Sequence, residues 1–232
     1  IFAMNLGHHL VGVSDFSDFP EEAKKIPSVG AYSKPLVEKI VSLKPDIVFV
    51  PQEGQDTVSD KFKKMKLKYF VIKMKTLSDV GDAALQMAET MNAKSKGLQF
   101  KTQFDKDLST AFQKSSEKSP QVGVIVQSEP PMVAANGTFI SEIVQRCGGK
   151  NIYSHLEGYP RISRESLYGK KIERLLLVEH FNSSTDRQKA ETFWSTKTRA
   201  TVHTLNPDTT TRPGPRIIEG VKLVCQTLRA DT

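Results

Sequence analysis

The sequence predicts an α/β protein with two Rossmann-like lobes, joined by one long backbone helix and separated by a cleft. Short apolar runs of strand length alternate with amphipathic stretches in the first part of the chain, and this alternation restarts after Pro120. Between the two runs, segment 77–118 contains no proline and many strong helix formers. We therefore expect an N-terminal lobe over 1–92, a connecting helix over 93–118 and a C-terminal lobe over 119–232.

In the first lobe, apolar runs of four residues and amphipathic stretches follow one another in the order expected of parallel α/β units. The expected strands are 10–13, 47–50 and 69–72, and the expected helices are 35–43 and 58–65. A proline at the first turn, as at Pro35, is typical of a helix start.

The connecting segment places apolar side chains at helical spacing in two separate stripes, so we expect two helices that break near Asn92. The second, of about 24 residues at about 1.5 Å each, would be roughly 36 Å long and would act as a stiff spacer. A flexible hinge would instead be rich in glycine, serine and proline.

The second lobe repeats the pattern of the first. Strands are expected at 122–126, 174–178 and 202–205, with helices at 139–146 and 186–194.

Composition excludes several classes of protein. With 38% hydrophobic and 25% charged residues, the 232-residue chain is typical of a globular protein, and no apolar run approaches the roughly 20 residues of a membrane span. The net charge of +7 comes from dispersed lysine pairs without interleaved aromatics, which indicates a solvated basic surface and no nucleic-acid partner. No nucleophile elbow, phosphate loop or spaced carboxylate pair is present, so we do not expect an enzyme.

The cysteines and histidines give little support for a metal site. Cys147 and Cys225 lack a second cysteine or a histidine at metal-ligand spacing, and the sequence leaves open one disulfide or two buried thiols. A zinc site would need about three histidines at strand ends, and His8 and His9 begin a loop instead. A single histidine, His155 or His180, could still serve as an axial ligand to cobalt or iron.

Aromatic residues gather in the loop that follows the first expected strand. Phe16, Phe19, Pro20 and Tyr32 precede the helix expected at Pro35. Loops at the carboxyl ends of parallel strands are where open α/β sheets build ligand sites, and ring faces offer apolar area. The alternative is that Phe16 and Phe19 cover the edge of the core.

Several motifs along the chain resemble the cobalamin-binding proteins of bacterial vitamin importers, in the helical-backbone class of periplasmic binding proteins. In the first lobe these are SDFPEEAKKIPSVGAY and LVEKIVSLKPDIVFV. In the second they are PPMVAANGTFISEIVQRCGGKNIY, YPRISRESL and NPDTTTRPGPRIIEGVKLVCQTL, in the family's order. The resemblance therefore covers nearly the whole chain.

The resemblance implies a cargo-binding role in an ABC importer, with cobalamin as ligand and no cofactor. It assigns pocket-lining positions to residues of both lobes, and polar contacts with the amide rim of the ligand to two residues of one loop. The pocket-lining residues are Phe19, Tyr32, Pro51, Met132 and Tyr159, and the polar residues are Asp208 and Arg212. Residues spaced like Asp208 and Arg212 could alternatively form a surface ion pair.

The aromatic residues at the pocket-lining positions differ from the family pattern. Tyr32, Pro51 and Tyr159 stand where a family member has tryptophan, and Met132 stands where it has phenylalanine. The same scaffold could therefore hold another corrinoid, a haem or a ferric siderophore. A third reading, a metal-cluster protein with two similar lobes, would require more cysteine ligands than Cys147 and Cys225.

The resemblance also implies partners and a compartment. Glu38 and Glu165, one on each lobe, match glutamates that dock onto the membrane permease, although each would also complement the dipole of its own helix start. Cys147 and Cys225 match a disulfide pair, which implies an oxidising compartment such as the periplasm. We expect a monomer. Because the sequence opens at Ile1 with an apparent helix end closed by Gly7, we expect upstream residues, with a signal peptide or a lipid anchor possible there.

Overall fold

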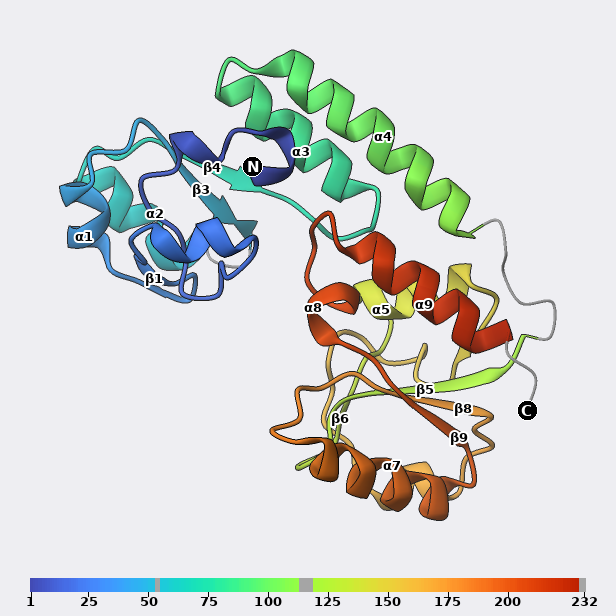
Figure 1. Cartoon of the computed structure of the whole chain (residues 1–232). Coiled ribbons are helices and arrows are strands. Elements are labelled where there is room, and N and C mark those ends of the chain that lie inside the picture. The colour runs from blue at the N-terminus through green and yellow to red at the C-terminus, as the bar shows by residue number, and fades with distance from the viewer. Residues whose placement is uncertain (53–54, 113–118, 230–232) are drawn as a thin grey trace. The chain divides into compact units, whose positions relative to one another are not determined.

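The structure is a computed structural model that describes residues 1–52, 55–112 and 119–229. The chain divides into two compact units, and both combine helices and strands (Figure 1). The first unit comprises Ile1–Met74 and Asp79–Gln103, and the second comprises Lys75–Ser78 and Phe104–Thr232. The mixed α/β class expected from the sequence is confirmed.

The first unit is built around one parallel strand pair, β3 (Val48–Pro51) with β4 (Tyr69–Ile72). Helices α1 (Val37–Ser42) and α2 (Gln55–Lys64) accompany it, and both strands lie where the sequence predicted them. Residues from both helices and from β3 form one apolar cluster: Val37, Ile40, Val50, Val58 and Phe62. Burial of these side chains stabilises the packing of both helices against the strand pair.

Short elements precede this core. Three are 3₁₀ turns, η1 (Phe2–Met4), η2 (Gly7–His9) and η3 (Glu21–Lys25), and two form an antiparallel hairpin, β1 (Gly30–Ala31) with β2 (Lys34–Pro35). In this hairpin Gly30 pairs with Pro35. Gly30 has φ +90°, and an added Cβ would lie 2.9 Å from the carbonyl oxygen of Lys34, so this turn requires glycine.

Three expectations for this region are wrong. Residues 10–13 form no strand, because only Val13 makes a bridge, with Ser28, and Pro27 has no amide N–H with which to extend the ladder. The helix expected from Pro35 begins at Val37, because Pro35 is held in the hairpin. The helical turn at the start of the sequence, η1, was expected to end at Gly7, but it ends at Asn5, which has φ 55°.

Two helices follow, α3 (Asp79–Thr90) and α4 (Lys94–Phe112). The predicted break is confirmed, since Asn92 lies between them in the left-handed conformation at φ 54°. In the first unit, α3 and α4 pack on the first residues of the chain through Met4, Leu6, Ala84, Ala88 and their neighbours. The last expected part of the connecting helix, 113–118, lies outside the described residues.

The second unit contains a five-stranded mixed sheet. Its strands are β5 (Gln121–Gln127), β6 (Met132–Val133), β7 (Lys150–Asn151), β8 (Arg174–Leu177) and β9 (Thr201–Thr204). The order is β6-β5-β8-β9, with β7 also paired to β5, and β6 is antiparallel to β5 while the others run parallel. The three long strands match the prediction, whereas the two-residue strands β6 and β7 carry no periodic signal.

Helices cover both faces of this sheet (Figure 1). Helices α5 (Phe139–Arg146) and α9 (Ile217–Arg229) lie on one face, and α7 (Ser184–Thr198) lies on the other. Trp194 of α7 is buried in a cluster with Ile125 of β5 and Leu175 of β8. The short helices α6 (Glu165–Tyr168) and α8 (Pro207–Thr210) complete the unit.

A disulfide between Cys147 and Cys225 joins α5 to α9, and the predicted bond is confirmed. Cys147 follows the last residue of α5, Cys225 lies within α9, and both are fully buried. The bond therefore ties two helices on one face of the sheet across 78 residues of chain.

Candidate functional site

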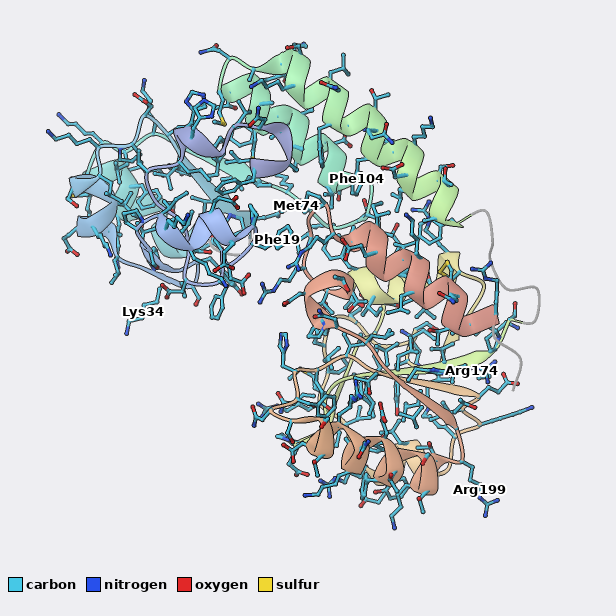
Figure 2. All side chains as sticks on the ribbon, in the orientation of Figure 1. Phe19, Lys34, Met74, Phe104, Arg174 and Arg199 are labelled. Carbon is cyan, nitrogen blue, oxygen red and sulfur yellow. A yellow bond between two sulfur atoms is a disulfide. The ribbon has the colours of Figure 1, made fainter. Side chains whose placement is uncertain are left out.

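The aromatic residues of the first unit lie on its surface and outside its core. Phe16, Phe19 and Tyr32 are exposed to 64%, 59% and 52%, respectively. None belongs to the apolar cluster beneath the β3–β4 pair. The alternative that Phe16 and Phe19 cover the core edge is therefore disfavoured, and Figure 2 shows Phe19 at the surface of its unit.

Hydrogen bonds fasten the two loops that carry these rings. The amide of Asp15 donates to the carbonyl of Gly30 at 3.2 Å, and the Ser28 hydroxyl donates to the carboxylate of Asp15. The amide of Val29 donates to the carbonyl of Val13 at 2.8 Å. The loop that carries Phe19 is thus attached to the segment that leads into the hairpin of Tyr32, which limits the conformational entropy that the rings lose when they bind a ligand.

Pro51 ends β3, paired with Ile72 of β4, and is half-buried. It lies at the carboxyl end of a parallel strand, where ligand sites form in α/β sheets.

In the second unit a pocket of about 290 Å³ opens at the carboxyl ends of β5 and β8. Its walls are formed by residues at or just after the ends of these two strands, by residues at both ends of α8 and by the loop before α6. They are Val126, Tyr159, Val178, Glu179, His180, Pro207 and Thr211. The sheet therefore presents its carboxyl edge to a hollow that combines apolar walls with a few polar groups, as small-molecule sites do.

Tyr159 is the predicted ring that lines this pocket. The residue is 44% exposed, yet the surrounding protein desolvates the hydroxyl and raises its pKa. At neutral pH the side chain is a neutral phenol, which offers a ring face and one hydrogen-bond donor.

Asp208 and Arg212 come together beside the pocket. The side-chain amide oxygen of Asn206 accepts the Asp208 N–H at 2.9 Å and so caps α8. The Asp208 Oδ1 lies 3.0 Å from Nε of Arg212 and 3.5 Å from Nε2 of His180. The two residues thus form the ion pair that the sequence left as an alternative, next to the pocket residues Pro207 and Thr211.

Glu179 is a pocket residue that the sequence reasoning missed. It accepts hydrogen bonds from the backbone N–H of Ser128, at 2.9 Å, and from the Ser128 hydroxyl, which also accepts from Nε1 of Trp194 at 3.2 Å. This series of hydrogen bonds attaches the loop after β5 to α7. The signal that could have found Glu179 is its place directly after a predicted parallel strand.

Met132, like Asp208 and Arg212, is not among the residues that line this pocket. It lies in β6, half-buried, paired with Gln127 and bridged to Arg161.

The two predicted docking residues are exposed and lie in first turns of helices, one in each unit. Glu38 is the second residue of α1, and Glu165 is the first residue of α6. The helices begin after Leu36 and Arg164, slightly later than expected.

Within the part of the chain that the structure describes, no group of three or more histidine, cysteine, aspartate or glutamate side chains could hold a metal ion. Among the same residues, no helix has both the length and the apolar character that a bilayer crossing requires.

The chain is similar to known periplasmic binding proteins. The family model described as "Periplasmic binding protein" matches residues 2–200. The Vitamin B12-binding protein of Pectobacterium carotovorum (strain PC1) is 26% identical over 235 residues, covering 99% of this chain and 84% of that protein. The Vitamin B12-binding protein of Yersinia pestis (strain Pestoides F) is 28% identical, with 97% and 80% covered.

Solved structures show the same architecture. The periplasmic vitamin B12 binding protein of Vibrio cholerae matches with a TM-score of 0.85 and 26% identity, covering 98% of this chain and 91% of that one. A periplasmic heme binding protein from Pseudomonas aeruginosa matches with a TM-score of 0.84 at 20% identity, covering 98% and 87%. The second likeness concerns the fold alone.

Proposed function

Because the chain belongs to the periplasmic binding protein family, we propose that it captures a cobalamin-type corrinoid outside the cytoplasm and delivers it to the permease of an ABC importer. The observation that carries the choice of ligand is the similarity of nearly the whole chain to vitamin B12-binding proteins. The role is binding and delivery, without catalysis.

The exposed rings suit this ligand. A corrin is a broad, largely apolar macrocycle fringed by amides, so it requires wide apolar side chains against its faces and a few polar groups at its edge. Phe19 and Tyr32 offer such faces in the first unit, and Tyr159 does so in the second. In this proposal Pro51 and Met132 add apolar contacts.

The size of the ligand supports a contribution from both units. A pocket of about 290 Å³ in the second unit is slightly smaller than the roughly 300–1,000 Å³ typical of small-molecule sites. A corrinoid is larger than most such ligands. We therefore propose that the same ligand also contacts Phe19 and Tyr32, and that Asp208 and Arg212 hydrogen-bond its amide rim.

Delivery requires a surface that the permease recognises. We propose that the exposed Glu38 and Glu165 provide it by pairing with basic residues of the permease. The buried Cys147–Cys225 disulfide supports an oxidising compartment, the periplasm or the outer face of a membrane. We propose that the protein acts as a monomer.

Titration of the purified protein tests the ligand. We expect calorimetry with cyanocobalamin to show sub-micromolar binding of one molecule per chain. Haem and a ferric siderophore serve as competitors. They are the alternative ligands, because this chain has fewer large aromatic residues at the pocket-lining positions than the family member has. Absence of both heat and spectral change with cyanocobalamin would overturn the corrinoid, and tighter binding of haem or the siderophore would replace it.

A further inference from the structure

We propose that His180, oriented by Asp208, is an axial ligand to the metal of the bound corrinoid. The inference deepens the proposed function and rests on it. It implies that the protein selects corrinoids whose axial position holds exchangeable water over those in which cyanide blocks it.

The position of His180 provides the first argument. Strand β8 ends at Leu177, the amide of Val178 continues the pairing by donating to Ile125 at 2.7 Å, and His180 follows two residues later. His180 is one of the residues that line the pocket, and 67% of its side chain is exposed. A nitrogen donor thus stands at the wall of the hollow, accessible to a ligand that enters it.

The chemistry of the other wall residues provides the second argument. Val126, Val178 and Pro207 are apolar and suit the face of a macrocycle. Burial raises the pKa of the Tyr159 hydroxyl and disfavours the phenolate that would bind a metal.

The remaining polar wall residues are already engaged by neighbours. Both carboxylate oxygens of Glu179 accept hydrogen bonds from Ser128, and the hydroxyl of Thr211 donates to the carbonyl of Pro207 at 2.9 Å. Among the residues that line this pocket, His180 is therefore the donor best suited to a transition metal.

The carboxylate of Asp208 provides the third argument. Its buried Oδ1 lies at ion-pair distance from two cations or potential cations, 3.5 Å from Nε2 of His180 and 3.0 Å from Nε of Arg212, and it has no hydrogen-bond partner among the described residues. A carboxylate beside one imidazole nitrogen retains the proton there, leaves the lone pair of the other nitrogen free, and strengthens it as a ligand. Metal-binding histidines commonly have such a carboxylate partner.

The step is a ligand exchange without redox chemistry. The unprotonated imidazole nitrogen donates its lone pair to cobalt, the cobalt–oxygen bond breaks, and the axial water leaves with its own electron pair. Cyanide holds cobalt far more tightly than water does, so cyanide-blocked corrinoids resist the exchange.

Two corrinoids that differ only in axial ligands test the inference on the full chain. For the wild-type protein, we expect diaquacobinamide to bind with a shift of its near-ultraviolet and visible absorption bands, whereas dicyanocobinamide binds without one. For His180→Ala, we expect loss of the shift and about 10- to 100-fold weaker binding of diaquacobinamide, with dicyanocobinamide affected by less than about twofold. Asp208→Asn should keep the shift but weaken binding of the aqua form.

His155→Ala is the matched control, since His155 is also exposed in the second unit but does not line the pocket. His180→Gln provides a second variant of similar polarity, with circular dichroism to verify its fold. A shift that persists in both His180 variants, or wild-type binding of diaquacobinamide without a shift, would overturn the inference while the proposed function stands. If neither cyanocobalamin nor either cobinamide binds, the proposed function and the role of His180 are both refuted.

Discussion

Among single residues, the exposed aromatic rings outside the apolar clusters are the candidates for contact with a ligand. Phe19, Tyr32 and Tyr159 each leave over two-fifths of their surface in water. Their removal should therefore change ligand binding more than it changes folding, because a large part of each ring is exposed and outside the apolar clusters of the protein.

Substitution of Phe19 tests this distinction. For Phe19→Ala we expect the affinity for cyanocobalamin to fall about tenfold or more, since a ring covered by ligand contributes about 1.5–3 kcal/mol. The midpoint of thermal unfolding should change by only a few degrees. Leu98→Ala is the control, because Leu98 is 52% exposed on α4 and should leave affinity unchanged. A large loss of stability in Phe19→Ala would instead indicate a role in the core.

A second residue-scale prediction concerns His203 on β9. Desolvation, and then the positive charge of Arg174, lower its pKa below 6.5, while Glu191 opposes them more weakly. Its buried Nε2 has no hydrogen-bond partner among the described residues. The unfolded chain therefore binds the proton more readily than the folded one, so the stabilising effect of neutral His203 is present above about pH 6.5 and is lost as pH falls below it.

Denaturant unfolding between pH 7.5 and pH 5 measures this effect. We expect the free energy of unfolding of the wild-type protein to decrease with acidity more than that of His203→Gln, which cannot titrate. Identical slopes for the two proteins would refute the prediction. His155→Gln, at an exposed position, should follow the wild-type slope.

At the scale of elements, sequence periodicity predicted the long strands and helices and failed for short ones. Strand β4 and helix α5 lie where the pattern placed them, because β4 is a continuous apolar run of strand length and α5 is long enough to show the helical period. Two-residue strands such as β7 carry no period, and their pairing depends on β5 far away in sequence. The missing strand at 10–13 is a tertiary effect, since the donor needed to extend it is absent at Pro27.

Some residues of the candidate site were likewise predicted from the sequence, and others were missed. The resemblance assigned ligand contacts to Tyr159, Asp208 and Arg212, and these roles stay a prediction. In the structure Tyr159 lines the pocket, and Asp208 pairs with Arg212 next to it. Glu179 was missed because it belongs to no motif of the resemblance, and Thr211 was missed although it lies within one of them. Each acquires its position from the end of a strand or helix, which a single sequence does not reveal at residue precision.

The disulfide links two helices, and its contribution to the free energy of unfolding can be measured. It closes a loop of 78 residues, for which the chain-entropy model gives about 4–5 kcal/mol, while measured losses for native disulfides are about 2–5 kcal/mol. We expect Cys147→Ala with Cys225→Ala to lower the free energy of unfolding of the second unit by about 2–5 kcal/mol, as measured by denaturant titration. Reduction of the wild-type protein should reproduce the loss, and an unchanged midpoint would contradict it.

At the scale of the whole molecule, delivery and binding should be separable. We expect Glu38→Ala with Glu165→Ala to leave the affinity for cobalamin intact and to abolish uptake in cells that carry the importer, because both side chains are exposed outside the ligand pocket. Glu22→Ala with Glu219→Ala removes one exposed glutamate from each unit elsewhere and should leave uptake normal. Normal uptake by the Glu38 and Glu165 double variant would remove the docking role.

We propose that one corrinoid contacts both Phe19 and Tyr159 when it is bound. Calorimetric titration of cyanocobalamin into the wild-type protein, Phe19→Ala, Tyr159→Ala and the double variant tests this proposal. We expect one ligand per chain throughout, weaker binding in each single variant and the weakest binding in the double variant. An affinity that responds to substitutions in only one unit, or two ligands per chain, would contradict it.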